Sequence, residues 1–222
     1  MKKFGVVVFV LLFTQFAMAG NIKRLFQDVK LPTQQVLEKQ TVGHPIVATT
    51  NYILTTNAGP TSGAAVTVSS FAHQPDVPRN LTITPGSTTA DVGTCTITVT
   101  GTNILGATIT EDFAFAANAS SATTGAKAFK TVTSIAWAAS CEDSPYTASW
   151  TVGVGELLGL KRCMASAGDL IRSLKDGATE ATQPTCTADD NEVEKNVCDV
   201  SGTMDNSAVW IFYFIQNYQC MP

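Results

Sequence analysis

The chain has 222 residues, of which 45% are hydrophobic and only 14% are charged, and its formal net charge is −4. This length suits one domain, or at most two, with a core of its own. Because the chain is acidic and its lysines and arginines are scattered, it lacks the basic patch that binds the phosphates of nucleic acids. We therefore expect no nucleic-acid partner.

The N-terminus, residues 1–19, has the layout of a secretory signal. Two lysines precede an apolar run over residues 4–13, and the sequence AMA stands before Gly20. The run is shorter than the ~20 apolar residues that span a bilayer, so it predicts a signal cleaved after Ala19 and no stable membrane span afterwards. The alternative is an apolar helix that stays attached and packs against a partner.

Residues 20–44 are expected to hold one short helix and a linker. In NIKRLFQDVK the apolar residues recur at helical spacing, and Pro32 ends the pattern. The apolar stripe consists of Ile22, Leu25, Phe26 and Val29. Such a helix docks either on the body of its own chain or on a partner subunit.

From residue 45 to residue 222, short extended runs alternate with turn residues, which predicts a β-domain. In TCTITVT, Cys95, Ile97 and Val99 share one face and threonines share the other. GTNILG supplies a turn and ATITEDFAFAA returns, so residues 94–116 are predicted to form a β-hairpin. One face of this hairpin should be buried, and the other should be wet and rich in hydroxyl groups.

The C-terminal half continues the β pattern. YTASWTVGVG alternates around Trp150, and AVWIFYFI is apolar on both faces, as in a central strand covered from both sides. SAGDLIRSLK is a second candidate helix, and TQPTCTADDNEVEKN is expected to be a surface loop. Together these runs predict an all-β fold, an antiparallel β-sandwich of jelly-roll-like or immunoglobulin-like type over residues 45–222, preceded by the short N-terminal helix.

The six cysteines are even in number and form no C-x-x-C pair, which favours disulfides over a zinc or redox site. Six cysteines can pair in many ways. The pair that we favour is Cys186 with Cys198, which would close a polar loop. The alternative is that some cysteines are buried free thiols.

No segment of the sequence has the residue pattern of a catalytic site. His44 and His73 lie near prolines in predicted loops, without a nucleophile motif. Glu111 and Asp112 are adjacent on a strand and point to opposite faces, which is wrong for a paired-carboxylate glycosidase. An acidic group lacks the ligand order and central glycine of an EF-hand loop, so a solvated loop is favoured over a calcium site. Its members are Asp189, Asp190, Glu192 and Glu194. We therefore expect no metal, no cofactor and no enzymatic activity.

Four segments occur in an order that resembles a structural module of tailed bacteriophages. They are HQPDVPRNLTIT, TITVTGTNILGATITEDF, WTVGVGELLGLKR and VWIFYFI, and the resemblance runs from His73 to Phe214. The family usually follows LGL with proline, where this chain has Lys161. The resemblance implies a capsid-decorating or other virion-surface protein whose partners are capsid or tail proteins and copies of itself. It implies no catalytic residues.

A secretory signal and disulfides are typical of exported proteins. A second hypothesis therefore stands beside the virion, namely a secreted or periplasmic β-sandwich that acts as a surface or binding protein of the adhesin type. In both hypotheses the threonine-rich face is a panel without a pocket.

Overall fold

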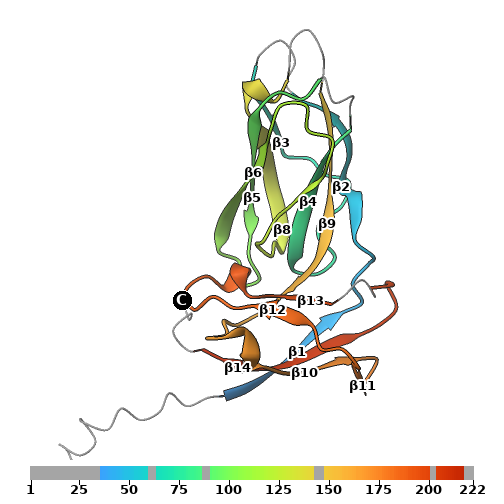
Figure 1. Cartoon of the computed structure of the whole chain (residues 1–222), viewed down its shortest axis with the longest axis vertical. Coiled ribbons are helices and arrows are strands. Elements are labelled where there is room, and N and C mark those ends of the chain that lie inside the picture. Colours follow the sequence, from blue (N-terminus) through green and yellow to red (C-terminus); the bar gives the residue numbers. More distant parts are fainter. Residues whose placement is uncertain (1–35, 60–63, 87–90, 143–147, 201–203, 218–222) are drawn as a thin grey trace, which may run out of the picture. The chain divides into compact units, whose positions relative to one another are not determined.

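A computed structural model describes residues 36–59, 64–86, 91–142, 148–200 and 204–217 (Figure 1). The chain divides into two compact units after Gln35, and all described residues belong to the second. The signal-like segment over residues 1–19 lies outside the described residues. So does the expected helix, whose stripe is Ile22, Leu25, Phe26 and Val29. The described part consists mostly of antiparallel strands in three sheets, with short 3-10 turns between some of them.

The threonine sheet has the strand order β3-β8-β5-β6. Its strands are β3 (Val66–Val68), β8 (Thr131–Trp137), β5 (Cys95–Thr102) and β6 (Thr108–Phe115). The expected hairpin is confirmed, because β5 pairs with β6 from Cys95 opposite Phe115 to Thr102 opposite Thr108. Cys95, Ile97 and Val99 are buried, and the threonines between them are exposed or half-buried.

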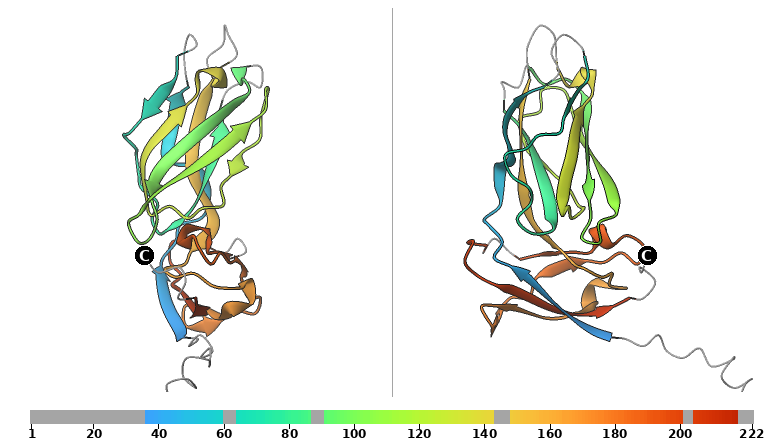
Figure 2. Two further views of the ribbon diagram at one scale, coloured as in Figure 1. Left: turned by 90° about the vertical axis from the view of Figure 1, so that its left-hand side faces the viewer. Right: turned by 180° about the vertical axis from the view of Figure 1, so that it is seen from behind.

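The central sheet has the order β12-β13-β9-β4-β7, and β2 also pairs with β9. Its strands are β12 (Thr185–Thr187), β13 (Val197–Asp199), β9 (Ser149–Gly159), β4 (Arg79–Pro85), β7 (Thr123–Thr124) and β2 (Thr49–Ala58). Trp150 is fully buried, as its alternating strand predicts, together with Ala148, Val152 and Val154. Side chains of this sheet and of the threonine sheet fill one hydrophobic cluster, and Figure 2 shows their strands in two further views.

The terminal sheet has the order β1-β14-β10-β11. Its strands are β1 (Val36–Gly43), β14 (Trp210–Gln216), β10 (Leu170–Lys175) and β11 (Ala178–Thr179). The expected central position of the C-terminal strand is confirmed. However, only one face of the strand is fully buried, whereas both were expected to be. Trp210, Phe212 and Phe214 are buried in a second cluster with Leu158, and the side chains of the opposite face are half-buried.

Two segments differ from the sequence prediction because long-range pairing decides their structure. SAGDLIRSLK forms a 3-10 turn over Ala167–Asp169, capped by Ser166, and then strand β10, which pairs with β14. Residues 36–43, expected within a linker, form β1 on the other side of β14. In both places the apolar strand β14 supplies backbone partners that local propensity does not reveal.

The expected polar surface loop TQPTCTADDNEVEKN is also more structured than predicted. It contains β12 and a 3-10 turn over Val193–Lys195, and it leads into β13. Glu194 is 7% exposed and Asn196 is fully buried. The two strands are joined by the disulfide Cys186–Cys198, which is the pair favoured from the sequence, and a further disulfide joins Cys95 to Cys141.

Candidate functional site

The two histidines are engaged by groups unlike those of a nucleophile–base pair. His44 is exposed, and its Nδ1 lies 2.5 Å from the carbonyl oxygen of Ser207. His73 is exposed and stacks on Tyr52, with ring centroids 4.6 Å apart. A catalytic imidazole of a nucleophile–base pair lies within hydrogen-bond reach of the hydroxyl or thiol that it activates. The contacts of these two rings instead attach loops to the β-domain.

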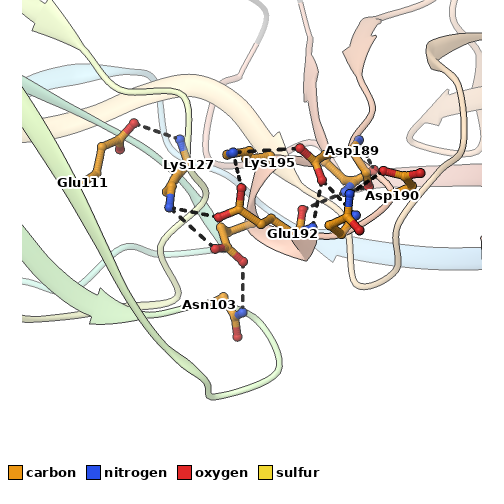
Figure 3. A network of polar contacts seen from close by, with 10 residues as sticks. Asn103, Glu111, Lys127, Asp189, Asp190, Glu192 and Lys195 are labelled. Atoms are coloured by element: carbon orange, nitrogen blue, oxygen red, sulfur yellow. Dashed lines mark hydrogen bonds and ion pairs between the residues drawn. The ribbon is translucent and has the colours of Figure 1, made fainter. Parts of the chain in front are cut away.

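The acidic group lies in a network of ion pairs with two lysines (Figure 3). Lys195 Nζ contacts the carboxylate of Glu192 and lies 3.9 Å from Asp189 Oδ2. Lys127 Nζ lies 3.4 Å from Glu192 Oε1 and 3.8 Å from Glu194 Oε1. Among the described residues there is no group of three or more His, Cys, Asp or Glu residues that could hold a metal ion.

A buried asparagine shapes this acidic segment. Asn196 Oδ1 accepts hydrogen bonds from the backbone N–H groups of Met164 and Asp189 at 2.8 and 3.1 Å. Its Nδ2 donates to the carbonyl oxygens of Asp189 and Glu192 at 2.7 and 3.0 Å. All four bonds satisfy a fully buried amide, so the loop has one defined conformation. This role of Asn196 could not be predicted from the sequence, because it depends on a contact with Met164, a residue distant in the chain.

The carboxylates of the network titrate differently because their surroundings differ. Hydrogen bonds from the backbone N–H groups of Asn191 and Glu192 lower the pKa of Asp189. The hydrogen bond from Lys195 lowers the pKa of Glu192. Burial raises the pKa of Glu111, although its Oε1 accepts hydrogen bonds from the N–H groups of Ala126 and Lys127. Among these three carboxylates, burial is the largest cause of the pKa shift only at Glu111.

The motif DVPRN forms a buried latch around Arg79. The guanidinium is fully buried, and its Nε donates to the carbonyl oxygen of Gly155 at 2.8 Å. Its Nη1 donates to the carbonyl oxygen of Ile46 at 2.9 Å and pairs with Asp76 at 3.2 Å. Asp76 Oδ2 in turn accepts the N–H of Ile46 at 2.7 Å. A buried charge requires this kind of pairing, and here it joins β4 to β9 and to the segment before β2.

Asn80, the next residue of the same motif, meets the motif GELLGL. Its Nδ2 donates to the carbonyl oxygen of Gly125 at 2.8 Å, and its Oδ1 accepts the N–H of Leu157 at 3.0 Å. A Cβ atom at residue 155 would lie 2.4 Å from Asn80 Oδ1, so the close approach requires Gly155. The motifs DVPRN and GELLGL are therefore in contact in the folded chain.

Lys161 ties β1 to the end of β9. Its backbone N–H donates to Gln40 Oε1 at 2.7 Å, and Gln40 Nε2 donates to the carbonyl oxygen of Gly159 at 2.9 Å. The Nζ of Lys161 lies 2.5 Å from Glu38 Oε1 and donates to the carbonyl oxygen of Lys39 at 2.9 Å. A proline has no N–H to offer Gln40, so this tie requires a residue other than proline at position 161.

No family model, no curated protein and no solved structure matches this chain. Within the part of the chain that the structure describes, no helix is long and apolar enough to cross a membrane. Several of the described residues make many polar contacts. They are Arg79, Asn80, Asn103, Asn196 and the members of the lysine–carboxylate network. Their contacts hold strands and loops together.

Proposed function

We propose that this protein is a non-enzymatic structural component of a tailed-phage virion, attached to the capsid or tail surface. One observation carries the proposal. The residues by which the chain resembles the phage module form its internal framework, because Arg79 and Asn80 bind the strand that contains Gly155 and Leu157. These shared residues therefore serve the fold of the chain, as expected of a structural protein.

We infer a β-sandwich for the body of this panel. The hydrophobic cluster between the central and threonine sheets includes Leu81 and Val152 from the first sheet and Ile97 and Ile135 from the second. The threonine face of β5 points away from that cluster. Two sheets that share one core and present polar outer faces are typical of an antiparallel sandwich.

The terminal sheet supplies apolar surface for lattice partners. Leu37 on β1 is 58% exposed and Ile171 on β10 is 55% exposed. Exposed aliphatic side chains on a sheet suit contacts with capsid or tail proteins or with further copies of the chain. A stable contact buries on the order of 1,200 Å² or more in total, so these side chains contribute only part of it.

A second candidate is an exported bacterial surface or binding protein of the adhesin type. The observation that favours it is the pair of disulfides, Cys95–Cys141 and Cys186–Cys198. Disulfides form and persist mainly in oxidising compartments outside the cytosol. This candidate shares the panel architecture and differs in where the chain matures.

Mass spectrometry of the native N-terminus in purified particles separates the two candidates. The virion proposal expects the chain to co-sediment with particles through a density gradient, in constant ratio to the capsid protein. A chain that begins at Gly20 and occurs only in particle-free culture supernatant would contradict the virion proposal and support the exported one.

A further inference from the structure

We propose that Lys127 and Asn103 become joined by an intramolecular isopeptide bond, with Glu194 as the proton carrier. The proposal is independent of the virion function. One carboxylate, that of Glu194, contacts both reactants. Glu194 Oε1 lies 3.8 Å from Lys127 Nζ, and Glu194 Oε2 accepts a hydrogen bond from Asn103 Nδ2 at 3.2 Å (Figure 3).

Asn103 is prepared as the electrophile. It is 4% exposed, and its Oδ1 accepts the backbone N–H groups of Leu105 and Ala107, each at 3.0 Å. Two donors on one carbonyl oxygen draw electron density from Cγ and stabilise the oxyanion that forms when a nucleophile attacks. The turn between β5 and β6 thus provides the same pair of hydrogen bonds that an oxyanion hole provides.

Lys127 supplies the amine, and Glu194 is placed to take its proton. The Glu194 side chain is 8% exposed and the Lys127 side chain is 21% exposed. A buried carboxylate between an amine and an amide can accept a proton from the first and deliver it to the second. The reaction requires that rotation about the single bonds of the unbranched Lys127 side chain bring Nζ from the Oε1 side of Glu194 to Asn103 Cγ.

The reaction balances without a cofactor or an oxidant. The Lys127 ammonium gives one proton to Glu194, and the resulting amine attacks Asn103 Cγ, so that a Nζ–Cγ bond forms. Glu194 passes the proton to Nδ2, the Cγ–Nδ2 bond breaks, and the side-chain nitrogen departs as ammonia. The ammonia takes the surplus proton from Nζ and leaves as ammonium. The product is an amide that ties the β5–β6 turn to the segment before β8.

Intact-mass spectrometry of the purified full chain, reduced, alkylated and unfolded, tests the proposal. The wild-type chain should weigh less than its calculated mass by one ammonia, and digestion should give a branched peptide that contains Asn103 and Lys127. Lys127→Met and Glu194→Gln should each restore the full calculated mass. Glu192→Gln is the matched control, because Glu192 also contacts Lys127, and it should keep the mass loss.

The wild-type mass decides the question even if a variant folds poorly, and circular dichroism checks each variant. A folded wild-type chain at its full calculated mass would overturn the proposal. So would a mass loss that persists in Lys127→Met, because the ammonia would then come from another reaction. Retention of the bond in Glu194→Gln would remove Glu194 as the proton carrier and overturn the mechanism proposed here.

Discussion

Replacing Arg79 by methionine tests whether the DVPRN latch stabilises the fold. Methionine keeps much of the length and apolar volume of arginine but donates no hydrogen bond. In the variant, the carbonyl oxygens of Gly155 and Ile46 lose their donor, and Asp76 loses its cation. The perturbation therefore removes polar contacts and leaves the surrounding strands in place.

The expected cost follows from burial. Arg79 is fully buried and the side chain of Asp76 is 13% exposed. Removal of one partner from a buried ion pair costs about 3 to 5 kcal/mol, because the remaining charge and acceptors stay buried without compensation. A domain of ordinary stability has roughly 5 to 15 kcal/mol in total, so the Arg79→Met variant should still fold with a much lower unfolding midpoint.

Urea unfolding followed by tryptophan fluorescence measures this loss, provided that wild type and variant share one m-value. Arg172→Met is the matched control, because Arg172 is exposed and its guanidinium lies 5.1 Å from the centroid of the Tyr213 ring. An exposed cation–π contact is worth about 0.5 to 1 kcal/mol. If the two arginine variants lose the same free energy of unfolding, the latch does not stabilise the fold as argued.

Further substitutions test three other parts of the structure. Trp150→Ala should cost about 3 to 5 kcal/mol of unfolding free energy, since Trp150 is fully buried, whereas Thr98→Ala on the outer face should cost well under ~1 kcal/mol; equal losses in urea unfolding would contradict the face assignment. Replacing Cys186 and Cys198 by serine should cost about 2 to 3 kcal/mol, and thiol labelling of the unreduced, unfolded wild type should find fewer than six free thiols. Burial raises the pKa of Glu111 above its ordinary value of 4.5, so the folded state favours the protonated acid and wild-type stability falls as pH rises through that raised pKa. Glu111→Gln should therefore gain stability relative to wild type as pH rises from below 4.5 to neutral, measured as unfolding midpoints across that range, and a constant difference would refute the assigned cause.

Local pattern was a good guide at two places where the chain folds back on a neighbouring segment. The β5–β6 hairpin could be predicted because its strands are adjacent and alternate in polarity, so the same residues that pair also define the buried face. The Cys186–Cys198 pair could be predicted for a similar reason, since β12 and β13 are close in sequence. Strand β10 was not predicted, because its longer pairing is with β14, which follows only after an intervening stretch of chain.

The sequence by itself determined the all-β class, the alternation around Trp150 and the buried side of β5, because strand geometry imposes a period of two on any half-buried strand. The tertiary structure alone decided what the polar residues do. Arg79 and Asn103 look like ordinary surface residues in the sequence, yet one is fully buried against Gly155 and the other is held against Glu194. Periodicity records which face of a strand is apolar, whereas a buried hydrogen bond depends on the register and spacing of segments far apart in the chain, which no local pattern encodes.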